Sequence, residues 1–242
     1  MALAESSVAV PAPSSVPQSI PPSVPRCESS TVDAGASYPV QLDVRGRAVL
    51  VVGGGRVALR KVQGLLAAGA VVTVVAPRVV AELWELAPAR ITVHHRRFRS
   101  DDIDGSWLVV TCTDSTAVNA TVAAPAEQQR VWVNAADDPA NCAFTLPAVA
   151  RQGPLVLTAA TGGASPALAR WFRRHWEAEL TPSWLDVLDV LAEARVDARH
   201  RWGSSEVDGW DEALDAGVID LVRSGQIDVG RALLRRTIGL DR

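Results

Sequence analysis

An apolar run that ends in three consecutive glycines constrains this chain more than any other feature. Residues 48–52 read AVLVV, Gly53-Gly54-Gly55 follows, and the stretch from Val57 to Ala68 has its apolar residues at helical spacing. A short run that is apolar on both faces is typical of a strand buried in a parallel sheet. The pattern therefore predicts the first strand–turn–helix unit of an α/β fold.

The alternation of strands and helices continues along the chain. Further strand-like runs lie at residues 71–76, 91–93, 108–110 and 131–135, and a helix is expected at 118–129. Such alternation predicts a parallel sheet that is covered by helices on both faces. Two later runs, 144–149 and 155–160, predict a hairpin outside that sheet, and every element after Pro166 is expected to be helical.

The first 37 residues differ in composition from the rest. Six of the fifteen prolines lie between Pro11 and Pro25, with serines filling the gaps. Proline lacks a backbone N–H, and such a stretch buries too little apolar surface to offset the entropy lost on ordering. We therefore expect residues 1–37 to form a disordered tail.

Composition excludes several classes of protein. A net charge of -3 over 242 residues argues against a large basic surface for nucleic acid. No apolar run approaches the roughly 18 residues of a membrane span, and no secretory signal pattern opens the chain. The three cysteines, Cys27, Cys112 and Cys142, are too few for a disulfide framework and lack metal-ligand spacing. We expect a cytoplasmic protein without a nucleic-acid or membrane partner and without metal-ligating residues.

The glycines form a G-x-G-x-x-A motif from Gly53 to Ala58. In this motif the first glycine permits the turn, the second leaves room for a pyrophosphate, and the small third residue lets helix and strand pack closely. The helix amino terminus adds unpaired N–H groups and a partial positive charge. We expect a bound dinucleotide here, and the alternative is a sheet that merely uses glycines to turn.

The kind of dinucleotide stays open on spacing alone. NAD sites commonly have Asp or Glu at the end of the second strand, where it holds the ribose hydroxyls. This chain has Val75-Ala76-Pro77-Arg78 at that place. Arg78 suits the 2′-phosphate of NADP, or it is a solvated loop residue.

Two further segments hold candidate side chains. Residues 134–139, NAADDP, follow the fifth strand, and the carboxyl ends of parallel strands line the ligand crevice. Asp137 or Asp138 can act there as a general base, or either can simply form the turn. Residues 161–166, TGGASP, lead into a helix with several arginines, so this loop either holds an anion or only caps the helix.

Three stretches together resemble one family: YPVQLDVRGRAVLVVGGGRVALRKVQGLLAAGAVVTVVAP, WLVVTCTD and VNAADDPANCAFTLPAVARQGPLVLTAATGGASPALAR. It is the precorrin-2 dehydrogenase/sirohydrochlorin ferrochelatase family, found as separate proteins and as the amino-terminal half of trifunctional siroheme synthases. The resemblance runs from about Tyr38 to Leu180 and is weaker beyond. The trifunctional members continue into a methyltransferase domain, which we do not expect here because the sequence stops at Arg242.

The resemblance implies a domain organisation and an activity. It implies a Rossmann-like NAD-binding domain at 38–147, a dimerisation segment at 148–180 and a small helical domain at 181–242. It also implies a homodimer that oxidises precorrin-2 to sirohydrochlorin with NAD⁺ and then inserts Fe²⁺, as a substrate, to give siroheme. Two alternatives stay open: a dehydrogenase that leaves chelation to another protein, and a non-catalytic NAD-sensing module.

The resemblance further implies the roles of individual residues. The family's essential aspartate follows an Asn-x-x and maps to Asp137 rather than Asp138. The cofactor contacts map to Gly53, Gly55, Arg56, Val57, Pro77, Arg78, Thr113 and Asp114. The carboxylates of the tetrapyrrole are expected to bind at Thr161, Gly162, Gly163, Ser165 and Arg170.

Deletion of residues 2–36 is expected to leave thermal stability and activity nearly unchanged, because this segment offers no apolar face to a core. The melting temperatures of the full and shortened chains, measured side by side, check this. A substantial fall in melting temperature would show that the tail packs against the folded part.

Overall fold

The computed structural model describes residues 37–241 of the chain. The predicted tail at 1–37 therefore lies, except for its last residue, outside the described residues. Tyr38, at the start of the described part, is almost fully exposed.

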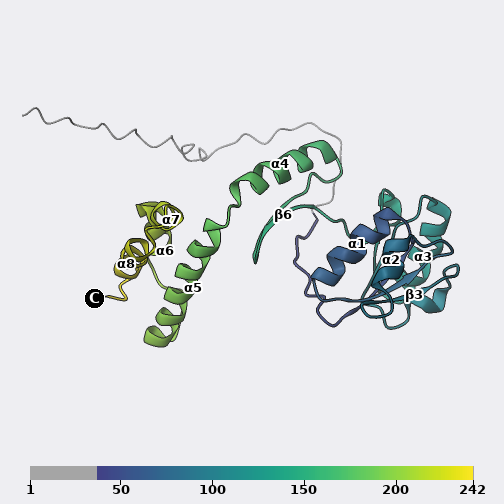
Figure 1. The fold of residues 1–242 in the computed structure, drawn as a ribbon, viewed down its shortest axis with the longest axis horizontal. Coiled ribbons are helices and arrows are strands. Elements are labelled where there is room, and N and C mark those ends of the chain that lie inside the picture. The colour runs from purple at the N-terminus through teal and green to yellow at the C-terminus, as the bar shows by residue number, and fades with distance from the viewer. Residues whose placement is uncertain (1–36, 242) are drawn as a thin grey trace, which may run out of the picture. The chain divides into compact units, whose positions relative to one another are not determined.

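A five-stranded parallel sheet forms the first part of the fold (Figure 1). Its strands are β1 (Ala48–Val52), β2 (Val71–Val75), β3 (Ile91–His94), β4 (Leu108–Thr111) and β5 (Trp132–Ala135). They lie in the order β3-β2-β1-β4-β5, and every neighbouring pair is parallel. This arrangement confirms the predicted α/β class and brings all five carboxyl ends to one edge of the sheet.

Helices cover both faces of the sheet. Val49 and Val51 of β1 face one apolar cluster, which includes residues of α1 (Arg56–Ala67) and α2 (Ala81–Leu86). Leu50 and Val52 face the other cluster, which includes residues of α3 (Thr116–Gln128) and the 3₁₀ turn η1 (Ser100–Ile103). Adjacent strand residues point to opposite faces, so the continuous apolar run AVLVV supplies both clusters at once.

The first strand of the hairpin begins four residues later than predicted, at Ala148 instead of residue 144. The strands of the hairpin are β6 (Ala148–Gln152) and β7 (Leu155–Ala159), which pair antiparallel in a sheet of their own. The expected first strand at 144–149 is therefore shifted toward the C-terminus, because Phe144 is bound to β5 through the side chain of Asn134. Its carbonyl accepts a bond of 2.9 Å from Asn134 Nδ2, and its ring packs on the α1-side cluster. Gly153 has a φ of 54°, which closes the turn directly after Gln152.

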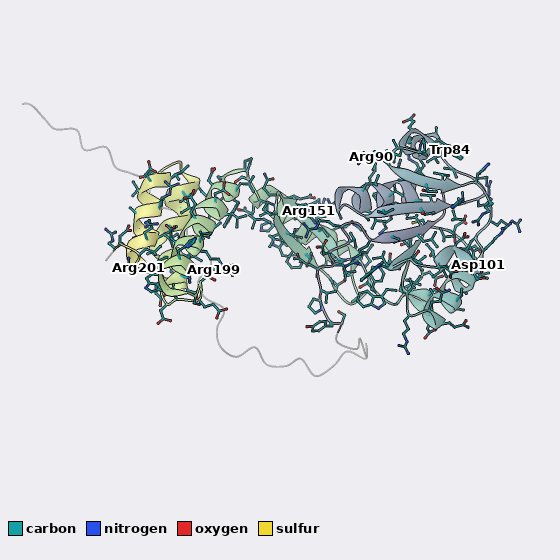
Figure 2. All side chains as sticks on the ribbon, turned by 90° about the horizontal axis from the view of Figure 1, so that it is seen from below. Trp84, Arg90, Asp101, Arg151, Arg199 and Arg201 are labelled. Atoms are coloured by element: carbon teal, nitrogen blue, oxygen red, sulfur yellow. The ribbon has the colours of Figure 1, made fainter. Side chains whose placement is uncertain are left out.

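Helix α4 (Pro166–Glu179) packs on both strands of this hairpin. In Figure 2 the label of Arg151 marks the position of β6. Ser165 caps α4, because its hydroxyl accepts a bond of 3.2 Å from Leu168 N, and Pro166 is the first helical residue. None of the residues of α4 is buried. The helix and hairpin thus leave apolar side chains uncovered, namely Val149, Leu157, Leu168 and Trp171.

The remaining described elements are helical, as predicted. They are α5 (Ser183–Trp202), α6 (Trp210–Ala213), the π-helical turn η3 (Leu214–Val218), α7 (Ile219–Arg223) and α8 (Ile227–Thr237). A buried cluster that includes Val187, Val222 and Leu234 joins them. The short 3₁₀ turn η2 (Pro139–Asn141) follows β5 in the α/β part.

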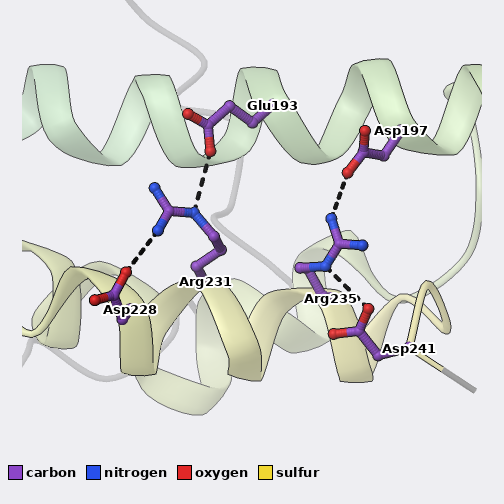
Figure 3. A network of polar contacts seen from close by, with 6 residues as sticks. All are labelled: Glu193, Asp197, Asp228, Arg231, Arg235 and Asp241. Carbon is purple, nitrogen blue, oxygen red and sulfur yellow. Dashed lines mark hydrogen bonds and ion pairs between the residues drawn. The ribbon is translucent and has the colours of Figure 1, made fainter.

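Ion pairs link α5 to α8 at the edge of this helical cluster (Figure 3). Arg231 Nε lies 3.1 Å from Glu193 Oε2, and Arg235 pairs with Asp197 and with Asp241. Exposed pairs of this kind contribute about 0–1 kcal/mol each, so the apolar cluster dominates the stability of this part. The predicted domain boundaries at 147/148 and 180/181 stay predictions.

Candidate dinucleotide and substrate site

An open cavity of about 1100 Å³ lies at the carboxyl edge of the parallel sheet. Its walls come from the glycine turn after β1 and from the segments that follow the other four strands. In open α/β sheets this edge is where ligands bind. Of the nine residues that the resemblance assigns to the cofactor or to catalysis, eight line it: Gly53, Gly55, Val57, Pro77, Arg78, Thr113, Asp114 and Asp137.

The glycine turn lies in close contact with the backbone of two other segments, the one after β4 and the one after β2. Gly53 has a φ of 123°, and a Cβ there would lie 2.5 Å from the carbonyl oxygen of Cys112. A Cβ at Gly54 would lie 2.2 Å from the carbonyl oxygen of Arg78. Neither position can therefore accept a side chain without moving the segment after β4 or after β2.

Gly55 faces open space instead. A Cβ at this position would meet no atom within 4 Å, and the residue lines the cavity. Gly55 is also the N-cap of α1, where no side chain bonds to the backbone and no acidic residue occupies the first turn. The free N–H groups and the positive end of the helix dipole therefore suit an anionic group such as a pyrophosphate. Arg56, also expected at the cofactor, is exposed but does not line the cavity.

A chain of hydrogen bonds joins the ends of β4 and β5. Thr113 Oγ1 donates to Asn119 Oδ1 over 2.8 Å, and Asn119 Nδ2 donates to Asp138 Oδ2 over 3.0 Å. Asn141 Nδ2 donates to the same carboxylate oxygen over 2.9 Å. Asn119 and Asp138 are both buried, so this network fixes the loop after β5 to the first turn of α3.

The two adjacent aspartates consequently differ in environment. Asp138 is bonded to two amides, whereas Asp137 is exposed, lines the cavity and has no hydrogen bond or ion pair with any residue from 37 to 241. Asp137 has a φ of 58°, a left-handed conformation that Asp tolerates better than most residues. The carboxylate of Asp137 is thus available for a ligand, and Asp138 holds the turn.

The thiol of Cys142 is hydrogen-bonded to the backbone at the start of the same turn. Its thiol accepts a bond of 3.1 Å from Ala135 N and donates to Ala135 O over 3.2 Å. The sequence did not indicate these roles of Cys142 and Asn119. Asn119 bonds to a residue nineteen positions away, and the bonds of Cys142 to Ala135 depend on how the chain folds back after β5.

Lys61 is a further residue that the sequence reasoning did not single out, although it lies within the GGGRVALRK stretch. Burial lowers the pKa of its ammonium, whereas the neighbouring Cys112 and Asp137 act to raise it. Burial raises the pKa of the Cys112 thiol to about 11, against the opposing effect of Lys61. Cys112 is therefore a protonated packing residue at neutral pH, and Lys61 is a half-buried cation whose charge interacts with that of Asp137.

The second predicted segment forms a capped loop. Thr161 Oγ1 accepts a bond of 3.0 Å from Ser165 N, and Gly162 and Gly163 both have positive φ. Ser165 then caps α4, while Arg170 is exposed on that helix. Thr161, Gly162, Gly163, Ser165 and Arg170 do not line the cavity at the sheet edge.

Among residues 37–241, no group of three or more His, Cys, Asp or Glu side chains is placed so that it could hold a metal ion. No helix in this range is both long and apolar enough to cross a lipid bilayer.

Comparison with known proteins identifies the type of the first domain. A family model described as "Putative NAD(P)-binding" matches residues 40–148, which include every strand of the parallel sheet. The first part of the fold is therefore an NAD(P)-binding domain of the Rossmann type.

Curated relatives cover most of this chain. The siroheme synthase of Nitrosospira multiformis is 32% identical over 207 residues, which are 83% of this chain and 44% of that protein. The siroheme synthase of Photobacterium profundum is 37% identical over 193 residues, which are 78% of this chain and 41% of that protein. The chain thus spans less than half the length of these relatives.

A solved structure matches over nearly its whole length. SirC, described as a precorrin-2 dehydrogenase, has a TM-score of 0.64 and 32% sequence identity, and the match covers 83% of this chain and 98% of SirC. This chain therefore belongs to the precorrin-2 dehydrogenase family, which includes the amino-terminal region of siroheme synthases.

Proposed function

We propose that this chain is an NAD⁺-dependent precorrin-2 dehydrogenase of siroheme biosynthesis, which oxidises precorrin-2 to sirohydrochlorin. One observation carries the proposal: a glycine turn at a helix amino terminus lines the same cavity as Asp137, a carboxylate without a hydrogen bond or ion pair among residues 37–241. The turn suits the phosphates of a dinucleotide, and the carboxylate suits a proton acceptor. The similarity to SirC, which is described as a precorrin-2 dehydrogenase, supports the choice of substrate.

The residues at the sheet edge fit NAD⁺. The open space at Gly55 and the free N–H groups of α1 would hold the pyrophosphate, with Val57 beside them. Pro77 and Arg78 would contact the adenosine half, and Thr113 and Asp114 would lie nearer the nicotinamide. Bound NAD⁺ supplies a hydride acceptor, and this chemistry belongs to the cofactor.

Asp137 would act as the general base. Oxidation of precorrin-2 removes a hydride and a proton, and the exposed carboxylate of Asp137 would take the proton. Asp138, Asn119 and Cys142 would be positioning residues, because they hold the turn from which Asp137 projects.

Ferrochelation is a second proposed activity of the same site. Insertion of Fe²⁺, a substrate here, displaces protons from pyrrole N–H groups and so also needs a base, for which Asp137 would serve. The carboxylates of the tetrapyrrole would bind at the Thr161–Ser165 loop and Arg170, where backbone N–H groups and a guanidinium are available. The cytoplasm is the proposed location, because Cys112 and Cys142 are free thiols.

An anaerobic assay with precorrin-2 and NAD⁺, followed by Fe²⁺, tests both activities. Formation of NADH and of the sirohydrochlorin spectrum would support the dehydrogenase, and a further change on addition of Fe²⁺ would support chelation. NADH without metal insertion would leave a dehydrogenase only, and neither change would favour an NAD-sensing module.

A homodimer is also part of the proposal. Val149, Leu157, Leu168 and Trp171 are exposed although they lie in regular elements of the hairpin and α4. Such uncovered apolar side chains are typical of an interface, and the resemblance assigns dimerisation to this segment.

Gly55→Asp is expected to lower NAD⁺ affinity at least about tenfold, or roughly 1.4 kcal/mol, because it places a negative charge where the phosphates approach. Since a Cβ at Gly55 meets no atom, the variant should fold normally. Calorimetric titration with NAD⁺ measures the effect. Gly64→Asp is the matched control, because Gly64 lies in the same helix, has open space and does not line the cavity. Unchanged NAD⁺ affinity in a folded Gly55→Asp variant would contradict the cofactor assignment.

Asp137→Asn is expected to lower the dehydrogenation rate by about 10²–10⁴-fold, as for the loss of a positioned general base. Asn keeps the size of the side chain and tolerates the left-handed backbone, so stability and NAD⁺ binding should be retained. Asp101→Asn is the control, because Asp101, labelled in Figure 2, is exposed and is not among the residues that line the cavity. Loss of only one of the two activities would show that dehydrogenation and chelation use separate bases.

Trp171→Glu is expected to shift the protein from dimer to monomer, because it places a charge among the exposed apolar side chains of α4 and the hairpin. Sedimentation equilibrium measures the change. Trp107→Glu is the control, since Trp107 is equally exposed but precedes β4 and stacks with Arg47. A Trp171→Glu variant that stays dimeric would place the interface elsewhere.

A further inference from the structure

Two arginine side chains converge on one hydroxyl in the helical part of the chain. Arg195 Nε donates to Ser205 Oγ over 3.1 Å, and Arg199 Nη2 donates to the same oxygen over 3.5 Å. The arginines lie four positions apart in α5, and therefore on one face of that helix, where Figure 2 labels Arg199. Ser205 follows in the segment 203–209, which joins α5 to α6.

Neither guanidinium is neutralised by a carboxylate in the described part of the chain. No ion pair joins Arg195 or Arg199 to an acidic side chain of residues 37–241. The neighbouring carboxylates of α5 pair instead with arginines of α8 (Figure 3). A guanidinium is best matched by the charged oxygens of a carboxylate or phosphate, whereas the hydroxyl of Ser205 offers one neutral oxygen. The two cations are therefore arranged for an anionic group at the position of this hydroxyl.

The surroundings of Ser205 leave room for such a group. Ser205 and Arg195 line an open cavity of about 820 Å³, whose walls come from α5 and from residues that follow it. Ser205 is half-buried in a segment without helix or strand, so it is accessible from that cavity. Trp210 Nε1 donates to Ser205 O over 3.2 Å and so holds the backbone of the serine in place.

The residues that follow Ser205 are acidic. Glu206, Asp208, Asp211 and Glu212 all line the same cavity, and all four are exposed. Exposed carboxylates are screened by water and salt, whereas the guanidinium groups lie within hydrogen-bond distance of the hydroxyl oxygen. Attraction by the arginines therefore outweighs repulsion by the carboxylates at this atom. The acidic sequence also complements an enzyme with a basic groove for its peptide substrate.

We propose that Ser205 is a phosphorylation site and that Arg195 and Arg199 bind the phosphoryl group once it is attached. A protein kinase and ATP are the co-reactants. The bond between Ser205 Oγ and the γ-phosphorus forms, the bond from that phosphorus to ADP breaks, and the hydroxyl proton passes to a base of the kinase. The phosphorylated side chain would then tie the segment 203–209 to α5 through charge-assisted hydrogen bonds. This modification is independent of the reaction proposed for the sheet edge.

Mass spectrometry of the full chain, isolated during growth and in stationary phase from the cells that naturally produce it, tests the modification. Phosphate on Ser205 is expected. Ser204 is the internal control, because its hydroxyl is engaged with the backbone of Glu206 and accepts no bond from an arginine of residues 37–241. An unmodified Ser205 in both samples, or phosphate on Ser204 alone, would overturn the proposal. Calorimetric binding of inorganic phosphate to such an unmodified chain would then assign the two arginines to a free anion.

Phosphoserine incorporated at position 205 of the full chain tests the role of the arginines. Guanidinium groups favour the dianion and so lower the second pKa of the phosphate, which is about 6 without such partners. The ³¹P signal is therefore expected to titrate about one pH unit lower than in a chain with phosphoserine at position 204.

Arg195→Ala and Arg199→Ala are each expected to remove part of this difference. Both positions are exposed on a helix, where alanine is well tolerated. Arg236→Ala is the control and should keep the difference, because Arg236 is an exposed arginine of α8 that makes no bond to Ser205. Equal titration of phosphoserine at 204 and 205, or a difference that survives both Arg195→Ala and Arg199→Ala, would overturn the assignment of the arginines.

Discussion

The close approach of three strand ends at the glycine turn is the constraint on which the site depends. Gly53 lies against the carbonyl of Cys112 after β4, and Gly54 lies against the carbonyl of Arg78 after β2. With any larger residue at either position, one of these segments would have to move. Because both contacts are to backbone atoms, they leave the side chains of the neighbouring segments free to face the cavity.

The second constraint is that the adjacent carboxylates of Asp137 and Asp138 lie in different environments, one exposed and one buried. Burial of Asp138 is tolerated because two amide groups donate to it, and a buried carboxylate without such donors would be costly. Its bonds reach back through Asn119 to Thr113, so the loops after β4 and β5 behave as one unit. Asp137 projects from that unit in a left-handed conformation, and its position is set by a network in which it takes no part.

The α/β part was predictable where one physical pattern governed each element. The run AVLVV is apolar on both faces, so these five residues alone predict a strand that is buried in the middle of a sheet. The six-residue helix α2 was missed, because Ala81–Leu86 is too short to show a clear helical period. The first hairpin strand was placed too early, because the apolar Phe144 packs against the parallel sheet rather than in the hairpin.

For the site, sequence motifs predicted the turn and the loop after β5 but not the contacts between them. The spacing of Gly53 to Ala58 predicts a tight turn between a strand and a helix through local geometry alone. The pairing of Asn119 with Asp138 joins residues nineteen positions apart and becomes visible only once β4 and β5 lie side by side. The same holds for Lys61, whose half-buried position near Cys112 follows from the packing of α1 on the sheet.

The arrangement of charge along the cavity follows from the strand order. Because β2 and β3 lie on one side of β1, and β4 and β5 on the other, Arg78 and Arg97 are gathered at one end and the aspartates at the other. The uncapped amino terminus of α1 lies between them and carries the positive end of the helix dipole. For the proposed dinucleotide, whose phosphates are anionic and whose oxidised nicotinamide ring is cationic, we therefore expect one orientation, with the ring toward Asp137. The electric field of these charges acts on a ligand before it reaches the cavity. The strand order therefore contributes to the orientation in which the ligand approaches, as well as to the shape of the site.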